Sequence, residues 1–305
     1  MFFMIEEFKK KLECPADELA FYTKEPMNRH TSFRIGGPAD LLVMPKTEHA
    51  VCCAVKAAKQ AGLPLTVLGN GSNVLVRDEG IRGVVLCIGT EYGAVHVEGT
   101  TMQAQTGALL SVLANEALKN SLTGLEFAGG IPGSLGGALF MDAGAYGGQM
   151  ADVVVSSRYY DAETDTIGTL TGKQHAFGYR TSAYKDHPQW VALSADMQLK
   201  IGDPAEIKAK MDDFSQRRRD KQPLNYPSAG STFKRPEGYF AGKLIQDAGL
   251  MGYTVGGAQV SEKHAGFVIN RGGATCADVL ALIDHVREEV RRQFGVELEP
   301  EVRLL

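Results

Sequence analysis

Three loop-like segments carry side chains that together could deliver a proton and bind an anion. The first places Arg180 after an aromatic residue, the second places Ser231 after a glycine, and the third places Glu301 near the C-terminal end of the sequence. Taken singly, each has a structural explanation as a surface arginine, a helix N-cap serine or a solvated glutamate. Without a histidine they do not form a hydrolytic triad. They suit protonation of a carbanion-like intermediate while the arginine binds a carboxylate, as in reduction of an activated double bond.

Two glycine-rich segments could bind phosphate. Residues 69–73 (Gly-Asn-Gly-Ser-Asn) form either a turn between strands, in which Asn-Gly supplies a positive φ, or a nest of backbone N–H groups for a phosphate. Residues 128–138 either bring backbone close to a pyrophosphate or form a helix packed tightly on a sheet. Because the two segments occur together, we favour a ligand for the second. Val74 breaks a GxGxxG pattern, so any dinucleotide would bind without a Rossmann fingerprint.

The composition excludes several classes of protein. The chain has 305 residues, of which 44% are hydrophobic, 35 are glycine and 12 are proline, which predicts an ordered protein of two or three domains. The net charge of −4 argues against a nucleic-acid partner. No apolar run reaches the ~18–20 residues of a membrane span, and the first residues do not read as a signal peptide. The basic run 217–221 is either the solvated end of a helix or an anion site.

The cysteines and histidines predict no metal site. The five cysteines are odd in number and form no CxxC pair, and the seven histidines are scattered. We therefore expect reduced structural thiols in a cytoplasmic protein and no protein-held metal.

Hydrophobic periodicity and capping residues predict an α+β or α/β chain. Helices are expected from Thr47 to Gly62, over 108–118, from the Asp203 capping box to about 219, over 239–248, and from Thr275, with Asp278 completing a capping box, to about 292. A glycine-dense loop system is expected over 124–148 and a domain boundary over 221–230. Strands are expected at 65–68, 74–76, 84–88, 94–97, 102–105, 191–199 and 266–270, and a hairpin at 153–161 and 166–170.

In this order, the segments resemble the UDP-N-acetylenolpyruvoylglucosamine reductase (UDP-N-acetylmuramate dehydrogenase) family, flavoenzymes of bacterial peptidoglycan precursor synthesis. The resemblance covers nearly the whole chain, and although single motifs would be weak, the ordered set is specific. The motifs that carry it are residues 28–37, 68–75, 124–148, 177–182, 230–233, 255–270 and 298–302.

The resemblance implies an α+β protein with a vanillyl-alcohol-oxidase/p-cresol-methylhydroxylase-type FAD-binding fold. Two α+β subdomains, 1–90 (with 294–305 returning to it) and 91–220, would bind FAD, and a smaller α+β domain, 221–293, would bind substrate. The short spacing from Arg180 to Ser231 is similar to that of the type II branch. The resemblance also implies a cytoplasmic protein, and we expect a monomer.

The resemblance assigns roles to individual residues. Arg180, Ser231 and Glu301 would be catalytic, and the segments 31–37, 69–73 and 130–138 would line the FAD. The cofactor-binding residues would be Arg34, Gly36, Gly69, Asn70, Gly71, Ser72, Asn73, Gly130, Ile131, Gly133, Ser134, Gly137 and Ala138, and the substrate-binding residues Tyr179, Lys221, Lys243, His264 and Asn270.

The implied reaction has two halves. NADPH reduces FAD and leaves, and the enolpyruvyl ether of UDP-N-acetylglucosamine (UDP-N-acetyl-enolpyruvylglucosamine) then enters. Hydride from flavin N5 adds to C3 while Ser231 protonates C2, and Arg180 and Glu301 stabilise the enol form of the substrate carboxylate. A carboxylate helps there only if it is protonated or hydrogen-bonded, so we hypothesise a raised pKa for Glu301.

Two residues depart from the family pattern: Asp142 and Arg235 stand where asparagine is common. Two alternatives remain beside the reductase. One is an oxidase of the same FAD fold, against which Ser231 with Lys221 and Glu301 argues. The other is an inactive flavin- or nucleotide-binding module, which would be expected to have lost at least one of the three catalytic residues.

Overall fold

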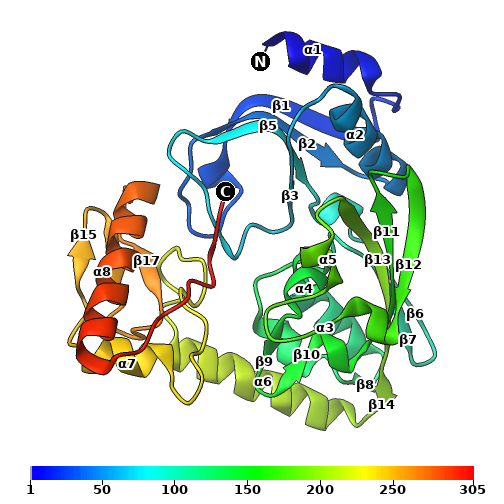
Figure 1. Cartoon of the computed structure of the whole chain (residues 1–305). Coiled ribbons are helices and arrows are strands. Elements are labelled where there is room, and N and C mark those ends of the chain that lie inside the picture. Colours follow the sequence, from blue (N-terminus) through cyan, green and yellow to red (C-terminus); the bar gives the residue numbers. More distant parts are fainter. Residues whose placement is uncertain (1) are drawn as a thin grey trace. The chain divides into compact units, whose positions relative to one another are not determined.

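The computed structural model describes residues 2–305, and the chain divides into two compact units (Figure 1). Unit 1 consists of Met1–Thr23, Asp40–Asn70 and Arg82–Gln216, and unit 2 consists of Lys24–Ala39, Gly71–Ile81 and Arg217–Leu305.

A four-stranded sheet with the order β1-β2-β5-β3 forms one layer of unit 1. Helices α1 and α2 cover it (Figure 1), and they share a core in which Phe8 of α1 and Val51 of α2 are fully buried. As predicted, Thr47 caps α2 by accepting a hydrogen bond from the amide of Ala50. The elements are α1 (Phe2–Lys11), β1 (Leu19–Pro26), β2 (Pro38–Pro45), α2 (Glu48–Gln60), β3 (Leu65–Leu68) and β5 (Ile81–Cys87).

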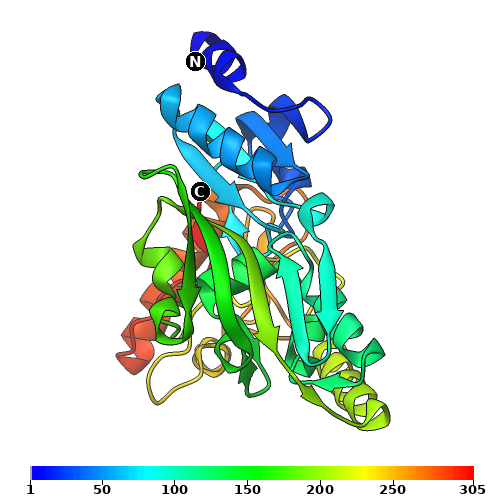
Figure 2. The same ribbon diagram turned by 90° about the vertical axis from the view of Figure 1, so that its right-hand side faces the viewer.

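A second, five-stranded antiparallel sheet of unit 1 has the order β12-β11-β13-β7-β6 and faces the viewer in Figure 2. Helices α3 and α4 pack on it around a core that includes Met102, Leu113 and Leu139. The predicted hairpin is β11–β12. The elements are β6 (Val95–Glu98), β7 (Thr101–Gln105), α3 (Leu110–Lys119), β8 (Leu122–Thr123), α4 (Leu135–Met141), β9 (Gly144–Ala145), β10 (Gly148–Gln149), β11 (Val154–Asp161), β12 (Thr166–Thr171), α5 (Ala183–Asp186), β13 (Trp190–Gln198), β14 (Lys200–Ile201) and α6 (Pro204–Lys221).

The prediction of a continuous loop system over 124–148 was wrong, because α4 lies inside it. Glycine is a poor helix former, yet Gly136 and Gly137 both stand in the first turn of α4. Tight packing outweighs propensity at Gly136, where a Cβ would lie 3.1 Å from Cβ of Thr106. The alternative of a helix packed closely on a sheet is therefore correct for this part of the segment.

Unit 2 is built around α8 and a three-stranded antiparallel sheet, β15-β16-β17. Val279, Leu282, Ile283, Val286 and Val290, the predicted apolar face of α8, are all buried. A short parallel pair joins the last strand, β18, to β4. The elements are β4 (Val74–Leu75), α7 (Ala241–Asp247), β15 (Thr254–Val255), β16 (Ala258–Val260), β17 (Val268–Asn270), α8 (Cys276–Phe294) and β18 (Arg303–Leu304).

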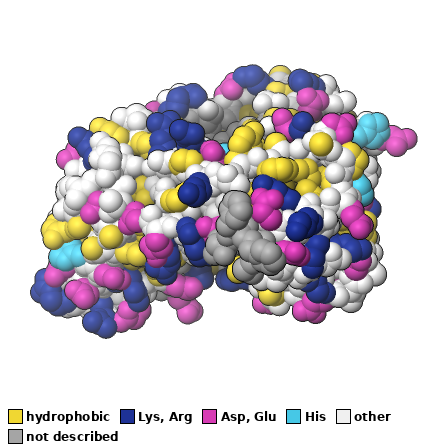
Figure 3. Space-filling view, turned by 90° about the horizontal axis from the view of Figure 1, so that it is seen from above, with side chains coloured by type: hydrophobic (Ala, Val, Ile, Leu, Met, Phe, Trp, Pro, Cys, Tyr) yellow, Lys and Arg dark blue, Asp and Glu magenta, His cyan; other side chains and the backbone are white. Residues whose placement is uncertain are grey.

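The sequence analysis did not predict α1, β1 or β2. In β1 the exposure does not alternate along the strand, and five consecutive residues of β2 are buried, so neither strand has the alternating pattern that identifies a strand by period. Among residues 2–305, no helix combines the length and apolarity needed to span a membrane. On the face in Figure 3, basic and acidic side chains are interspersed, as on an ordinary solvated surface.

Candidate functional site

The two glycine-rich segments meet inside unit 1. Asn70 Nδ2 donates a hydrogen bond to the carbonyl oxygen of Pro132 at 2.6 Å. A Cβ at Gly69 would lie 2.4 Å from Ser134 Oγ, so only glycine leaves that hydroxyl in place. The structure therefore brings together predicted cofactor residues that are more than 60 positions apart in the sequence.

Ser134, the N-cap residue of α4, carries an unsatisfied hydroxyl. Its side chain is 2% exposed and makes no capping hydrogen bond, and among the described residues its Oγ has no partner. A buried polar group without a partner costs about 1–3 kcal/mol and calls for an explanation. A Cβ at Gly137 would meet open space. An unsatisfied hydroxyl beside an open backbone surface fits a ligand rich in hydrogen-bond acceptors, such as a phosphate-bearing cofactor.

The predicted cofactor residues of unit 2 also lie together. The amide of Ser32 donates to the carbonyl of Gly71 at 3.0 Å, which joins the 31–37 loop to the 71–73 loop. Gly71 has φ +61, as the predicted Asn-Gly turn requires, and a Cβ there would lie 2.0 Å from the carbonyl oxygen of His30. Gly36 has φ +137, and a Cβ there would lie 2.6 Å from that of Val76. Arg34 is exposed at φ +55. Close backbone approach explains both glycines.

Arg180 stands on a tight turn. Gly178 and Thr181 exchange two backbone hydrogen bonds at 3.0 and 3.1 Å, so Tyr179 and Arg180 form the tip of the turn. Arg180 has φ +58, a conformation that an arginine adopts rarely, and Ser182 Oγ anchors the turn by donating to the carbonyl of Phe140. The Arg180 guanidinium lies 5.1 Å from the centroid of the Tyr179 ring. Backbone strain at such a residue is typical of functional sites.

The segments that carry Ser231 and Glu301 pair with each other in unit 2. Ser231 is exposed and follows Gly230, which has φ +78. The next residue, Thr232, is buried: its carbonyl accepts from the amide of Glu301 at 2.8 Å, and its Oγ1 accepts from the amide of Val268 at 3.0 Å. The sequence analysis did not single out Thr232, although it positions both predicted catalytic residues of this unit.

Asn73 connects the predicted cofactor loop of unit 2 to the same segment. Its Nδ2 donates to the carbonyl of Glu301 at 3.2 Å, and its own carbonyl accepts from the amide of Arg303 at 3.0 Å. A predicted cofactor residue and a predicted catalytic residue are thus held side by side.

The predicted substrate-binding residues have different surroundings. Lys221 ends α6, and its positive charge together with burial lowers the pKa of His264, burial having the larger effect. Lys243 forms an ion pair with Asp247 one turn along α7. The side-chain amide of Asn270 already forms hydrogen bonds with the backbone. Its Nδ2 donates to the carbonyl of Phe33, and its Oδ1 accepts from the amides of Gly272 and Ala274.

Comparison with known proteins decides the family. Residues 222–305 match the family described as "UDP-N-acetylenolpyruvoylglucosamine reductase, C-terminal domain", and residues 39–169 match "FAD binding domain". The chain is 50% identical over 302 residues to the UDP-N-acetylenolpyruvoylglucosamine reductase of Caldanaerobacter subterraneus subsp. tengcongensis, and the aligned residues cover 99% of both chains. It is 53% identical over 281 residues to that of Clostridioides difficile, covering 92% of both. The chain belongs to the UDP-N-acetylenolpyruvoylglucosamine reductase family.

A solved structure of the family agrees. The crystal structure of UDP-N-acetylenolpyruvylglucosamine reductase from Thermus caldophilus is similar with a TM-score of 0.79 and 32% sequence identity, over 94% of this chain and 98% of that one. The resemblance seen in the sequence, the α+β fold class with its FAD-binding fold, and FAD as the cofactor are confirmed.

The two departures from the family pattern have structural surroundings that explain the residue types. Asp142 ends α4 with φ +42, a conformation that aspartate and asparagine tolerate better than most residues, and its Oδ1 accepts from the amide of Ala151 at 2.9 Å. Burial raises the pKa of its carboxyl group, while the charge of Arg180 acts in the opposite direction. The guanidinium of Arg235 lies 4.0 Å from the centroid of the Phe240 ring.

Proposed function

We propose that this protein is a UDP-N-acetylmuramate dehydrogenase: an FAD-dependent enzyme that consumes NADPH to reduce the enolpyruvyl ether of UDP-N-acetylglucosamine to UDP-N-acetylmuramate in bacterial peptidoglycan precursor synthesis. Membership of the family supports this activity. The observation that carries it in the structure is the backbone pairing of Thr232 with Glu301, because it joins the segment with the exposed Ser231 to the segment that carries Glu301.

The proposed cofactor residues fall into two groups, each within one unit. In unit 1, FAD would give Ser134 Oγ the partner that the chain does not supply, and the open surface at Gly137 would admit it. When bound, FAD supplies the hydride that NADPH provides. The proposed contacts are Gly69, Asn70, Gly130, Ile131, Gly133, Ser134, Gly137 and Ala138 in unit 1, and Arg34, Gly36, Gly71, Ser72 and Asn73 in unit 2.

The substrate defines what the side chains must do. Addition of hydride at C3 of the enolpyruvyl group places charge on C2, and this charge is delocalised into the adjacent carboxylate as an enolate. The reaction is complete when C2 receives a proton. The site therefore needs a proton donor at C2 and groups that stabilise negative charge on the carboxylate oxygens.

Three side chains meet these needs in the proposal. Ser231 Oγ donates the proton to C2. Arg180, whose turn is fixed by Gly178 and Thr181, binds the carboxylate with its guanidinium N–H groups. Glu301 stabilises the enol oxygens, for which its carboxyl must be protonated or hydrogen-bonded; a raised pKa of Glu301 remains a prediction.

Further residues are proposed to bind the substrate. Tyr179 is 58% exposed at the tip of the Arg180 turn, so its ring is available for contact with a ligand. Lys221 and His264 would contribute charge and hydrogen bonding, since Lys221 lies close enough to depress the pKa of His264. Lys243 and Asn270 would have to exchange their present partners, Asp247 and backbone groups, for substrate.

We propose the organisation that the family implies: FAD-binding subdomains 1–90 (with 294–305) and 91–220, and a substrate-binding domain 221–293, of type II. We also propose that the protein acts in the cytoplasm as a monomer. Its five cysteines are free of disulfides, which is typical of a reducing compartment.

The experiment that tests the function is an anaerobic absorption titration of the purified protein. We expect a flavin spectrum that bleaches with NADPH and recovers when the enolpyruvyl substrate is added. A flavin that recovers only with oxygen would favour an oxidase, and one that NADPH does not bleach would favour an inactive binding module.

The role of Ser231 has its own test. Ser231→Ala is expected to retain FAD and NADPH-dependent bleaching but to lose about 10²–10⁴-fold in the rate of recovery with substrate, because one positioned acid contributes that much. Ser231→Cys, which keeps a proton donor, is expected to regain part of the rate. Near-normal recovery in Ser231→Ala would exclude Ser231 as the proton donor.

A further inference from the structure

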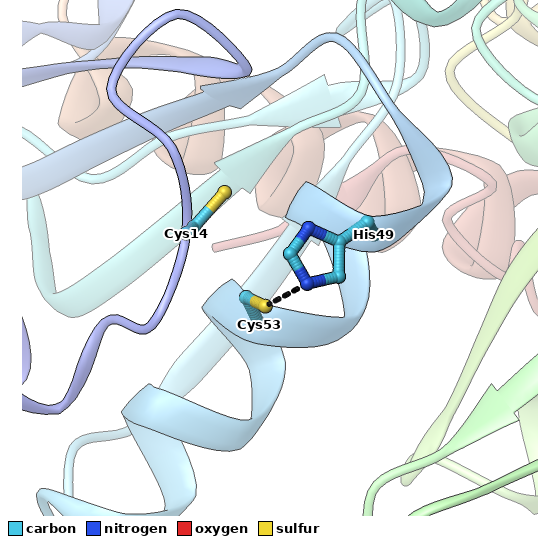
Figure 4. Close-up of side chains that lie close together, drawn as sticks. All are labelled: Cys14, His49 and Cys53. Atoms are coloured by element: carbon cyan, nitrogen blue, oxygen red, sulfur yellow. Dashed lines mark hydrogen bonds between the residues drawn. The ribbon is translucent and has the colours of Figure 1, made fainter.

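Three side chains that could bind a metal lie together in unit 1, and none of them is assigned to FAD or substrate. They are Cys14, His49 and Cys53, here called the Cys14 cluster (Figure 4). Their ligand atoms all lie within 4.8 Å of one another. His49 and Cys53 stand one turn apart on α2, and Cys14 comes from the segment between α1 and β1. The sequence analysis expected no cluster of cysteine and histidine, because no short spacing links Cys14 to the other two.

The histidine of this cluster is oriented as a metal ligand would be. His49 Nδ1 lies 3.0 Å from Glu18 Oε2, and His49 Nε2 lies 3.3 Å from Cys53 Sγ. With Nδ1–H donating to the carboxylate, the lone pair of Nε2 is on the side of the thiols. A carboxylate that holds the second ring nitrogen is the usual support of a metal-binding histidine.

Glu18 is itself held in place. Its Oε2 accepts from Thr47 Oγ1 at 2.6 Å, and Thr47 caps α2, the helix that carries His49 and Cys53. The supporting group of the cluster is thus fixed to the same helix as two of its three members.

We propose that Cys14 Sγ, Cys53 Sγ and His49 Nε2 bind a zinc ion, with water as the fourth ligand. Two sulfurs and an imidazole nitrogen are a ligand set that suits Zn²⁺. Zn–S bonds of ~2.3 Å in a tetrahedron place the sulfurs ~3.8 Å apart, so atoms now up to 4.8 Å apart need to close by about 1 Å. Binding releases the two thiol protons to solvent, and the two thiolates balance the charge of the ion.

Solvent access supports the fourth ligand. The side chain of His49 is 58% exposed, and both cysteines are partly exposed, so water can reach the ion and the ion can enter. The proposed site contains none of the residues assigned to FAD or substrate. The ion therefore takes no part in the proposed reductase reaction.

The structural effect is to fasten the N-terminal segment to α2. Helix α1 already contacts α2 through buried Phe8 and through Lys11 Nζ, which donates to the carbonyl of Gln60 at 2.7 Å. Cys14 follows α1 by three residues, so a zinc ion shared with α2 adds a second attachment. Zinc should then raise the melting temperature of the holoenzyme, since a ligand that binds only the folded chain stabilises it.

The test measures zinc binding by the FAD-loaded protein with its thiols reduced, and by matched cysteine variants. The proteins are incubated with ZnCl₂, freed of unbound metal, and analysed for zinc per chain, and Co²⁺ replaces Zn²⁺ to report thiolate ligation by absorption. We expect one zinc per wild-type chain and a thiolate-to-cobalt charge-transfer band. Cys14→Ser and Cys53→Ser should lose both. Glu18→Gln should weaken binding by about 10–100-fold through the histidine.

The matched control is Cys52→Ser, which removes the neighbouring thiol on the same helix. It should keep one zinc, the cobalt band and the zinc-dependent rise in melting temperature. Turnover with NADPH should be unchanged in Cys14→Ser, which also shows that the variant is folded. Wild-type protein without bound zinc, equal zinc in wild type and Cys14→Ser, or a Cys14–Cys53 disulfide in place of thiolate ligation would each overturn the proposal.

Discussion

Helices α4 and α8 both begin with a hydroxyl residue as N-cap, but the polar groups of their first turns find different partners. The two N-cap residues are Ser134 and Thr275. In α8 the chain supplies the acceptors: Thr275 Oγ1 accepts from the amide of Asp278, and the carboxylate of Asp78 accepts from the amides of Cys276 and Ala277 at 2.8 and 3.0 Å. In α4 the backbone carbonyls of Ala108 and Thr106 accept from the amides of Leu135 and Gly136 at 2.8 and 2.9 Å, whereas the N-cap hydroxyl has no partner among residues 2–305 and the first turn has no acidic residue.

Under the proposed function, this difference distinguishes a structural helix start from one whose N-cap hydroxyl would contact a ligand. A helix N-terminus attracts negative charge, and α8 meets this need with two aspartates of its own chain. An acidic residue in the first turn of α4 would repel a phosphate. Changes at α8 should therefore alter stability, and changes at α4 should alter binding of FAD.

The largest contrast is expected between adjacent glycines of α4. Gly137→Val should lower FAD affinity by about 5–150-fold, because the new side chain occupies the open surface proposed for the cofactor and overpacking costs about 1–3 kcal/mol. The apoprotein should be as stable as wild type, since a Cβ at Gly137 meets nothing within 4 Å. FAD affinity by fluorescence titration and apoprotein melting measure the two effects.

Gly136→Val is the control, because its Cβ would press on Thr106 at 3.1 Å and lower the stability of the apoprotein itself. Full FAD affinity in Gly137→Val would rule against the proposed cofactor surface.

At α8, Asp78→Ala should lower the stability of the protein rather than its affinity for FAD. Removing the carboxylate leaves the amides of Cys276 and Ala277 without their acceptors, which should lower the free energy of unfolding by about 1–3 kcal/mol. Asp78→Asn keeps one acceptor oxygen and should lose less. Urea unfolding of both variants, with FAD content measured in parallel, tests this prediction. It is contradicted if Asp78→Ala unfolds like the wild type.

Removing the N-cap hydroxyl should change the free energy of unfolding of the apoprotein differently in the two helices. Thr275→Ala should lower the free energy of unfolding by about 1 kcal/mol. Ser134→Ala should leave it equal or higher, because the variant removes a buried hydroxyl that has no partner. With FAD, Ser134→Ala should bind about two- to tenfold more weakly through loss of one hydrogen bond. An apoprotein destabilised equally by both substitutions would remove the distinction between the two helix starts.

The same pair of helices shows what a sequence can and cannot predict. The capping box of Thr275 and Asp278 was predicted because its partners are three residues apart. The contribution of Asp78 was not, because it lies 198 positions before Cys276 and no periodic pattern connects them. Likewise the glycine loop around Ser134 was recognised, but that its hydroxyl has no partner follows only from the packing.

The candidate site likewise contains features that the sequence predicts and contacts that only the folded structure shows. Arg180, Ser231 and Glu301 were chosen by residue type and family resemblance, whereas the pairing of Thr232 with Glu301 depends on a contact between distant segments. The Cys14 cluster was missed for the same physical reason, since only folding places Cys14 beside α2. Local capping and periodicity are encoded in short spacings, and sites assembled from several segments are not.

The smallest effect is expected at the C-terminal ends of the two helices. Both end with a left-handed residue, Gly295 in α8 and Asp142 in α4. Burial raises the pKa of Asp142, so the folded state holds this proton more tightly than the unfolded state does. Its stabilising contribution is thus complete at low pH and is lost as the pH rises through the raised pKa.

Asp142→Asn keeps the left-handed conformation and an oxygen that accepts from the amide of Ala151, but it carries no charge. Because the neutral amide resembles the protonated acid, the variant should match wild type in stability near pH 3 and exceed it at pH 7. The hydrogen bond from the amide of Ala151 and, to a smaller extent, the charge of Arg180 oppose this gain, which is why it should be small. Urea unfolding at both pH values measures it; a variant less stable than wild type at pH 7 would show that these two contributions outweigh burial.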